Sequence, residues 1–388
     1  MIHDIFIPFV ADKFEEMGFT KLWDPDKVVL IYDHLVPASQ LDDTRHFHTG
    51  DAFAEKYGMI HVHRSDGICH QLMTEAGHVK PGNVVFGTDS HTTTYGCGGA
   101  FSTGIGYTEM AAILGTGTLW VKVPETIHIN IEGTLPKGVM SKDIILRIIG
   151  DLRADGATYC ALEFTGSTVE NMSVASRMTM SNMAIEAGAK NGIFEVDDIT
   201  IDYIKAHGGA EPVIYKADED AVYDEVIDIN LDEIEPTVSF PHLPENAKTF
   251  SEIGDIKIDQ VVIGSCTNGR LEDLREAAEI LKDRKCAKGV RVIVIPATQQ
   301  IYLDAMEEGL LKIFIEAGAV VSTPTCGPCL GGYMGILAAG ERAVATTNRN
   351  FVGRMGHVDS EIYLASPATA AASAVTGKIT SAWEVMGK

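Results

Sequence analysis

The hydrophobic pattern consists of short β-branched runs that stop abruptly at polar or reactive residues. Five of these runs are KVVLIYDH, NVVFGTDSH, QVVIGSCTNGR, AVVSTPTC and RAVATTNRN. Most of them lack an alternation of apolar and polar residues, which is typical of strands buried in a parallel sheet. Helical patterns such as RLEDLREAAEILK and QIYLDAMEEGLLKIFIEAG follow several predicted strands. This alternation of strand and helix predicts an α/β architecture.

The predicted strands end in residues that can carry chemistry. These endings are Asp33-His34, Asp89-Ser90-His91, Cys266, Cys326 and Asn348-Arg349. A single Asp or Asn after a strand commonly forms a turn or caps a helix. In open α/β sheets, however, ligands bind beyond the carboxyl ends of the strands. Five such endings together therefore predict one shared site.

Two changes in composition predict domain boundaries. The segment VKVPETIHINIEG, residues 121–133, opens a new section after a glycine-rich region. The acidic stretch 216–247 carries three prolines near its end, and we expect it to be an exposed connection. We therefore predict three α/β domains, at residues 1–125, 126–237 and 238–388.

The charge balance excludes several classes of partner. The 388-residue chain has 31 basic and 54 acidic residues, which gives a formal net charge of −23. The negative electrostatic field of this charge repels phosphate backbones and anionic lipids, so we expect neither nucleic acid nor a membrane as a partner. The chain contains no apolar run of the ~18 residues that a membrane span needs. The first residues, MIHDIFIPFV, also lack the basic start of a secretory signal.

The cysteine count indicates thiol chemistry rather than disulfides. The chain has seven cysteines, at positions 69, 97, 160, 266, 286, 326 and 329. An odd number spread thinly through a long chain without a signal argues against a disulfide framework. We therefore expect a cytoplasmic protein with metal-binding or catalytic thiols.

Cys326 and Cys329 form a Cys-x-x-Cys motif in the segment TPTCGPCLGG. A second such motif, which would indicate structural zinc, is absent from the sequence. Cys266 ends a predicted buried strand, and two neighbouring parallel strands would bring it beside the pair. Three thiolates favour an iron–sulfur cluster that has one ligand fewer than usual, and an iron without a protein ligand can act as a Lewis acid. A Cys₃His zinc site is the open alternative.

The motifs resemble those of the aconitase superfamily of hydro-lyases. The resemblance rests on VVIGSCTNGRLEDL, STPTCGPCLGG, DSHTTTYGCGGAFSTGIG and TTNRNFVGRMG, and it runs in order through nearly the whole chain. It implies one [4Fe–4S] cluster per chain, held by Cys266, Cys326 and Cys329, with a fourth iron that has no protein ligand. It also implies that the three α/β domains surround this cluster and that the swivel domain of the family is absent.

The resemblance implies roles for further residues at matching motif positions. Acid–base chemistry would fall to Asp33, His34, His70, Asp89, His91 and Glu186. Substrate binding would fall to His3, Ser90, Arg349 and Arg354, and contact with the cluster to Asn182 and Asn348. These residue types suit the reaction, because dehydration of a hydroxy acid needs a proton for the leaving hydroxide and cations for the carboxylates.

The resemblance also implies a partner chain and a class of substrate. Single-chain members of the family continue into a swivelling domain, whereas this chain stops at Lys388, so we expect a separate small subunit that carries it. The chain starts inside a family block, so we expect a truncated or misassigned start. The substrate would be a hydroxy dicarboxylate or tricarboxylate. The closest resemblance is to large subunits that interconvert 2- and 3-isopropylmalate in leucine biosynthesis, with homoaconitase and 2,3-dimethylmalate dehydratase large subunits as alternatives.

Two other classes of function have weaker support. An NAD-dependent dehydrogenase is suggested by GCGGAFSTGIGYTEM, but the third glycine of the dinucleotide-binding fingerprint is missing there. An iron-sensing protein that grips RNA is disfavoured by the net charge of −23. A hydro-lyase subunit is therefore the leading hypothesis.

Overall fold

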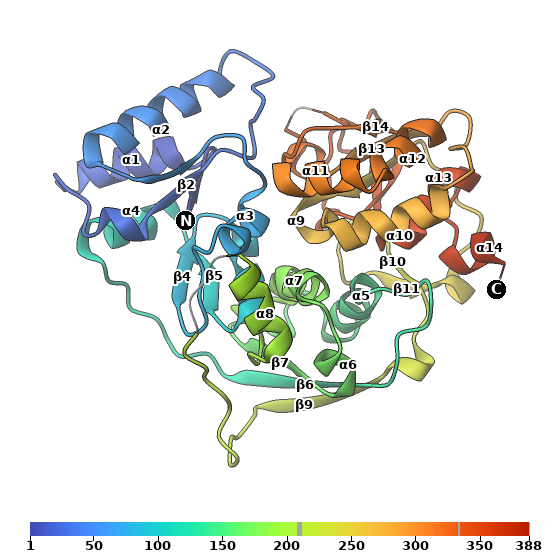
Figure 1. Ribbon diagram of the computed structural model, residues 1–388, viewed down its shortest axis with the longest axis horizontal. Helices are drawn as coiled ribbons and strands as arrows, with labels where there is room; N and C mark the ends of the chain where they lie inside the picture. Colours follow the sequence, from blue (N-terminus) through green and yellow to red (C-terminus); the bar gives the residue numbers. More distant parts are fainter. Residues whose placement is uncertain (208–211, 333, 388) are drawn as a thin grey trace.

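The computed structural model describes residues 1–207, 212–332 and 334–387, and these form an α/β fold with four sheets (Figure 1). This confirms the predicted fold class. The division into three domains stays a prediction. Within the described residues, no helix has the length and apolar character that crossing a membrane requires.

The N-terminal part contains two small parallel sheets. One has the order β1-β2-β3, with bounds Ile2–His3, Val29–Ile31 and His61–His63, and the other pairs β4 (Val84–Gly87) with β5 (Phe101–Gly104). Its helices are α1 (Ile7–Glu16), α2 (Asp43–Tyr57), α3 (Cys69–Glu75) and α4 (Tyr107–Thr116), with short 3₁₀ helices η1 (Pro25–Lys27) and η2 (Ser90–Gly98). The apolar face of α1 is buried at Ile7, Val10 and Phe14. Phe14 packs edge-on against Phe53 of α2, and this contact joins the two helices.

The middle part is a parallel four-stranded sheet with the order β8-β7-β6-β9. Its strands are β6 (Thr126–Glu132), β7 (Ala161–Thr165), β8 (Asn191–Phe194) and β9 (Glu225–Asn230). The helices are α5 (Ser141–Leu152), α6 (Ser167–Glu170), α7 (Val174–Met183), η3 (Ala184–Ala187) and α8 (Asp198–Ala206), and Figure 1 places all the α-helices on one side of the sheet. The isoleucines of β6 and α5 form the centre of this core.

The C-terminal part is a seven-stranded sheet with the order β11-β10-β16-β15-β12-β13-β14. The strands are β10 (Thr237–Ser239), β11 (Ala247–Thr249), β12 (Gln260–Gly264), β13 (Arg291–Ile295), β14 (Val320–Val321), β15 (Arg342–Ala345) and β16 (Glu361–Leu364). The helices are α9 (Ser265–Asn268), α10 (Leu271–Leu281), α11 (Gln299–Glu307), α12 (Leu310–Ala317), α13 (Pro367–Thr376) and α14 (Ala382–Met386), with the 3₁₀ helices η4 (Leu231–Glu233), η5 (Phe250–Glu252) and η6 (Gly327–Leu330) nearby. Strands β12 to β16 pair in parallel, and β10 and β11 pair antiparallel at one edge.

All five predicted strand runs are strands in the structure, namely β2, β4, β12, β14 and β15. The helix predicted after Cys266 is α10. The helical pattern after Pro296 is two helices, α11 and α12, because Gly309 adopts a left-handed conformation with φ +75° between them. Burial was only partly predicted, since β14 lies at the edge of its sheet and is exposed or half-buried.

The prediction that 216–247 is only an exposed connection is wrong. The segment contributes β9, which pairs with β6, and β10, which is buried in the large sheet. In β9 the residues Ile227 and Ile229 alternate with polar residues and pack against the core, while the acidic side chains face water. The abundance of acidic residues concealed this alternation, which is the pattern of a half-buried strand.

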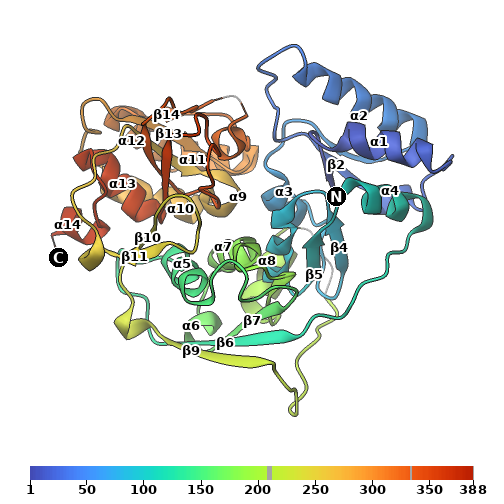
Figure 2. The ribbon, with the colours of Figure 1, turned by 180° about the vertical axis from the view of Figure 1, so that it is seen from behind.

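Helices from different parts of the chain meet near the centre of the molecule. Helix α7 contacts both η2 and α9, and α3 contacts both η2 and α9. Figure 2 shows the same convergence from behind, with α3 and α7 between the N-terminal and C-terminal parts. The ends of strands from separate sheets are thereby directed toward one region.

Candidate active site

Asp33 and His34 follow β2 and form a buried ion pair. His34 Nδ1 lies 2.6 Å from Asp33 Oδ1, and the other Asp33 oxygen accepts a hydrogen bond from the Cys69 N–H at 2.7 Å. Burial alone would lower the pKa of His34, but the Asp33 carboxylate holds it well above its usual value. The pair therefore keeps a proton on the imidazole inside the protein.

Asp4 positions this pair, although the sequence analysis gave it no role. Its fully buried carboxylate accepts hydrogen bonds from the backbone N–H groups of Ile5, His34 and Leu35, at 3.0, 3.1 and 2.8 Å. These bonds fix the loop after β2. The available signal was that His3-Asp4 also ends a strand, β1, in the same manner as the other reactive endings.

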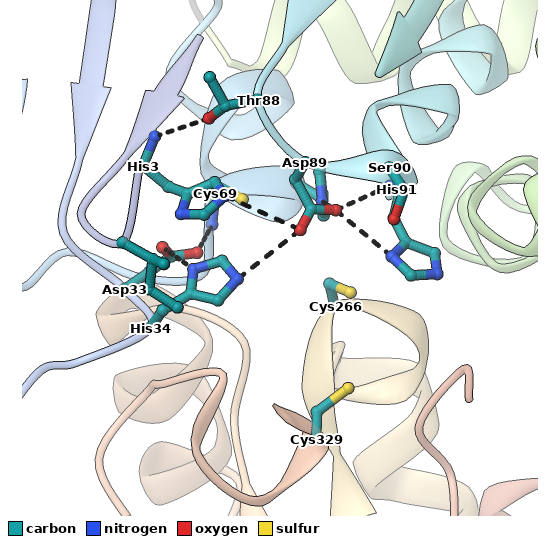
Figure 3. Close-up of polar contacts among 12 residues, drawn as sticks. His3, Asp33, His34, Cys69, Thr88, Asp89, Ser90, His91, Cys266 and Cys329 are labelled. Atoms are coloured by element: carbon teal, nitrogen blue, oxygen red, sulfur yellow. Dashed lines mark hydrogen bonds and ion pairs between the residues drawn. The ribbon is translucent and has the colours of Figure 1, made fainter. Parts of the chain in front are cut away.

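Asp89, which follows β4, contacts His34, His70 and His91, and Figure 3 shows its position beside His34 and His91. Its Oδ1 lies 2.8 Å from His70 Nε2 and accepts the backbone N–H of His91 at 2.7 Å, while its Oδ2 lies 3.7 Å from His34 Nε2. Burial would raise the pKa of Asp89, but hydrogen bonds from His34 and His70 hold it well below its usual range. His70 differs from His34, because burial lowers its pKa.

His91 begins a second chain of contacts that ends at an arginine. His91 Nε2 lies 2.7 Å from Glu186 Oε1, which also accepts a hydrogen bond from Arg349 Nε at 2.8 Å. Arg349 Nη1 donates to Ser90 Oγ at 2.9 Å. Burial would raise the pKa of Glu186, but His91 and Arg349 hold it below its usual value. The predicted residues of η2, η3 and the loop after β15 thus form one connected network.

His3 and Arg354 carry buried nitrogen atoms without a hydrogen-bond partner among the described residues. The His3 ring stacks on His34 with centroids 4.1 Å apart, and neither of its ring nitrogens has a hydrogen-bond partner. Arg354 Nε is likewise buried and unpaired. Buried polar atoms normally find partners. Their lack here indicates a place that a polar ligand completes.

Two of the three predicted cluster cysteines, Cys266 and Cys329, lie on the C-terminal part of the chain and face Asp89 across the site (Figure 3). Cys266 is in α9, directly after β12, and Cys326 and Cys329 lie in and beside η6. The prediction that their strands are neighbours is wrong, because β13 lies between β12 and β14. Hydrophobic runs reveal strands but carry no information about their order.

Two asparagines contact two of the three cysteines, Cys266 and Cys329. Asn348 Nδ2 lies 3.4 Å from Cys266 Sγ, and Asn348 Oδ1 lies 3.4 Å from Cys329 Sγ. Asn182 Nδ2 also lies 3.4 Å from Cys266 Sγ. The Cys326 loop is tied to the histidine side, because the Cys326 N–H donates to Asp33 O at 2.9 Å. The thiols and the acid–imidazole groups therefore line the same space.

The spacing and chemistry of the thiols fit a cluster better than a single ion. All three are buried, with 6% exposure or less. Among described side chains, two carboxylate–imidazole groups have ligand atoms that all lie within 4.8 Å of one another, and the three thiols do not form such a group. A single zinc ion with Zn–S bonds of about 2.3 Å would draw three sulfurs within about 4.6 Å of one another. A larger cluster needs the wider spacing and supplies positive charge to these thiolates.

Arg270 supports the segment that carries Cys266, and the sequence analysis gave this arginine no role. Its guanidinium is buried and donates to the carbonyl oxygens of Cys266 and Thr267 at 2.7 and 2.6 Å. Thr267 Oγ1 in turn donates to Asn182 Oδ1 at 3.1 Å. The signal was its place in GSCTNGR, next to a predicted ligand. Sequence alone does not reveal which carbonyls a buried arginine reaches.

Comparison with known proteins gives concordant results. The model of the aconitase family (aconitate hydratase) matches residues 1–255 and 246–377. The 3-isopropylmalate dehydratase large subunit of Moorella thermoacetica is 56% identical over 386 residues, which cover 99% of this chain and 92% of that protein. The protein of the same name from Acetivibrio thermocellus is 57% identical over 381 residues, which cover 98% of this chain and 91% of that protein.

A solved structure supports the fold. The crystal structure of Thermococcus kodakaraensis aconitase X in its holo-form has a TM-score of 0.51 at 13% identity, covering 91% of this chain and 83% of that chain. At this identity the likeness concerns the fold alone. The family match and the two relatives lead to one conclusion. The chain belongs to the aconitase family, in the group of the 3-isopropylmalate dehydratase large subunits.

Proposed function

We propose that this chain is the large, cluster-binding subunit of a hydro-lyase that interconverts 2- and 3-isopropylmalate. The observation that carries the proposal is the 56% identity to a 3-isopropylmalate dehydratase large subunit over 99% of the chain. The acid–base network and the thiols that face each other are consistent with this reaction.

The proposed cofactor is one [4Fe–4S] cluster, held by Cys266, Cys326 and Cys329. The buried thiols, their spacing and the amides of Asn182 and Asn348 beside them support it. When bound, the cluster would supply a Lewis-acidic iron without a protein ligand, which makes hydroxide a better leaving group. The three α/β domains would surround it.

His34 is the proposed proton donor to the leaving hydroxyl group. Asp33 keeps its pKa well above the usual value, so His34 retains a proton at neutral pH. Burial lowers the pKa of the nearby His70, whose Nε2 lies 2.8 Å from Asp89 Oδ1. Two imidazoles with opposite shifts of pKa are typical of sites that divide the acid and base roles. His91 and Glu186 would complete the proton path on the other side.

Arg349, Arg354, Ser90 and His3 are the proposed substrate-binding residues. Arg349 is already held in place by Glu186 and Ser90. An arginine fork suits a carboxylate, because it can donate two parallel hydrogen bonds. The unpaired nitrogens of His3 and Arg354 would receive partners when the substrate binds.

The proposed partner is a small subunit that carries the swivel domain. The relatives are named as large subunits, which implies a second chain in those enzymes. The partner would close the site, provide the base that removes the carbon-bound proton and distinguish the substrate side chains. This division leaves the chemistry of the two carboxylates and the hydroxyl to the present chain.

The proposal is tested by an assay of the anaerobically reconstituted chain together with a small subunit of a 3-isopropylmalate dehydratase. We expect dehydration of isopropylmalate only when both chains are present. The ultraviolet absorption of the alkene product measures the reaction. The Asp33→Asn variant keeps one oxygen for the Cys69 N–H and should lose about 10²-fold or more in kcat. Turnover of homocitrate or dimethylmalate in place of isopropylmalate would contradict the proposed substrate. No turnover of any of the three acids would contradict the reaction.

A further inference from the structure

Tyr95 is a buried residue beside the site that the proposed function does not yet use. It lies in η2, and none of its surface is exposed. Its hydroxyl oxygen lies 3.3 Å from Nδ1 of His70, and the two rings are tilted against each other with centroids 5.8 Å apart. In the described part of the chain, neither of these two polar atoms has another hydrogen-bond partner.

The contact at the other ring nitrogen of His70 shows where the ring carries its hydrogen. His70 Nε2 lies 2.8 Å from Asp89 Oδ1. Although burial would raise the pKa of Asp89, hydrogen bonds from the histidines hold it well below its usual range, so this carboxylate is ionised and can only accept. Nε2 therefore carries a hydrogen. In a neutral imidazole the second nitrogen is then an acceptor, so the Tyr95 hydroxyl donates to Nδ1.

A doubly protonated His70 fits this arrangement poorly. Both ring nitrogens of an imidazolium are donors, so Nδ1–H would point at the Tyr95 oxygen and the hydroxyl hydrogen would have to turn away. The described residues offer that hydrogen no second partner. A buried donor without a partner is costly, so Tyr95 disfavours a second proton on His70.

His34 shows the opposite case beside the same carboxylate. Its Nε2 lies 3.7 Å from Asp89 Oδ2, but its Nδ1 lies 2.6 Å from Oδ1 of Asp33. A carboxylate at Nδ1 stabilises a cation, whereas a phenol that donates to Nδ1 stabilises the neutral ring. Burial lowers the pKa of both histidines, but Asp33 raises that of His34 well above its usual value. The group at Nδ1 therefore distinguishes the two imidazoles.

We infer that Tyr95 is a positioning residue that holds His70 as the neutral imidazole with its hydrogen on Nε2. This inference rests on the proposed function, in which His34 and His70 take different roles in proton transfer. In this arrangement His70 donates to Asp89, and Asp89 in turn faces the protonated His34. Tyr95 thus fixes the direction of the hydrogen bonds on one side of the shared carboxylate.

The other titratable groups around His70 do not act at Nδ1. The carboxylates of Asp89 and Asp33 favour protonation of the ring, and His91 on η2 opposes it. On α9, which also packs against α3, the titratable group is Cys266, whose sulfur contacts two asparagines. The only polar neighbour of Nδ1 in the described part of the chain is therefore the phenol.

The test is nuclear magnetic resonance of the full chain with ¹⁵N-labelled histidine rings, recorded before reconstitution at several pH values. His70→Gln identifies the signals of His70 among the 13 histidines. In the wild type we expect Nδ1 to stay unprotonated even below pH ~6.5, the ordinary pKa of a histidine. Tyr95→Phe removes only the hydroxyl group, and water can then accept from Nδ1–H. The midpoint of the His70 titration should therefore rise by about one pH unit in this variant.

The pH profile of the two-subunit enzyme provides a second readout. Activity that needs a neutral His70 is lost as the pH falls through its pKa, so the acidic limb of kcat should move up by about one pH unit in Tyr95→Phe. KM should stay within about twofold, because Tyr95 is fully buried. Tyr223→Phe is the matched control, since its hydroxyl contacts Glu163 at 3.2 Å and its ring stacks on another histidine, His128. It should leave the His70 signals and the pH profile unchanged.

The outcomes separate this inference from the proposed function. A protonated Nδ1 in the neutral wild-type ring would overturn the role of Tyr95, as would unchanged His70 signals and an unchanged pH profile in Tyr95→Phe. If Tyr95→Phe does not fold by circular dichroism, the wild-type spectrum decides alone. A wild-type chain that shows the expected His70 signals but turns over none of the three acids would contradict the proposed function and still support the placement of the hydrogen by Tyr95.

Discussion

Arg349 is held in a fixed orientation by two neighbours of different chemistry. Its Nε donates to Glu186 at 2.8 Å and its Nη1 donates to Ser90 at 2.9 Å. The side chain is still 19% exposed, so these two contacts do not enclose it completely. A lysine would keep the charge at this position but could not make this set of contacts, because its ammonium is a single point.

Arg349→Lys should therefore weaken substrate binding more than turnover. We expect KM for the hydroxy diacid to rise at least about tenfold, which corresponds to ~1.4 kcal/mol, while kcat falls less. Steady-state kinetics of the two-subunit enzyme measure both. The control is Arg147→Lys, an exposed arginine that pairs with Asp151 one helical turn away. A KM within about twofold of wild type would contradict the assignment of Arg349 to a carboxylate.

At the scale of elements, the junction between β12 and α9 places Cys266 in the site. Gly264 has φ +140°, and a Cβ at this position would lie 2.3 Å from Ile295 O and 2.8 Å from Ile295 Cβ. Ile295 belongs to the paired strand β13, so the close approach is between two strands and cannot be relieved by a side-chain rotation. The turn that aims Cys266 therefore requires glycine.

Gly264→Ala should destabilise the chain and displace the cysteine. We expect the free energy of unfolding to fall by about 2 kcal/mol or more, because both the backbone angle and the space disfavour a side chain. Iron bound per folded chain should fall as well. Gly254→Ala is the control, since nothing lies within 4 Å of a Cβ at that exposed position. Urea unfolding and iron analysis compare the two variants. Equal free energies of unfolding and equal iron contents would contradict the proposed strain at position 264.

The segment that follows α3 carries a histidine, His78, that titrates differently in the folded and unfolded chain. His78 Nε2 lies 2.8 Å from His63 Nε2, and His63 Nδ1 lies 2.7 Å from Asp66 Oδ2. Burial, followed by the neighbouring His63 and His61, lowers the pKa of His78 to about 4. In an unfolded chain a histidine has a pKa of about 6.5.

The sign of the resulting pH dependence follows from these two values. Between pH ~6.5 and pH ~4 the unfolded chain binds a proton at His78 that the folded chain does not bind. The stabilising contribution is therefore complete above this window and is lost as the pH falls through it. His78→Gln should reduce the slope of the free energy of unfolding against pH in this window, measured by urea unfolding at several pH values. An unchanged slope would mean that His78 is not held neutral.

The sequence predicted the elements of the site better than their arrangement. Strand ends such as Asp33-His34 and Asp89-Ser90-His91 could be found because an apolar run that stops at reactive residues is a local pattern. The insertion of β13 between β12 and β14 could not be found, because strand order depends on contacts between distant segments. Likewise, no local pattern indicates that Lys142 reaches Thr347 across the molecule.

At the scale of the whole molecule, the site is assembled from nearly the full length of the chain. Its residues run from His3 to Arg354, and they come both from the ends of strands in separate sheets and from helices such as α3, α7 and η3. The net charge of −23 opposes the approach of a dianion, so the local cations Arg349 and Arg354 must outweigh the global field. Within the network, the carboxylates of Asp33, Asp89 and Glu186 each contact a histidine.

The central claim is that three cysteines hold an iron–sulfur cluster within this network. The most direct test is iron and sulfide analysis with visible absorption after anaerobic reconstitution, comparing the wild-type chain with Cys266→Ser. Cys160→Ser is the matched control, because Cys160 is half-buried and lies outside the site. We predict about four irons and four sulfides per wild-type and Cys160→Ser chain, and loss of both in Cys266→Ser. Zinc without sulfide in the wild type, or an intact cluster in Cys266→Ser, would contradict the account.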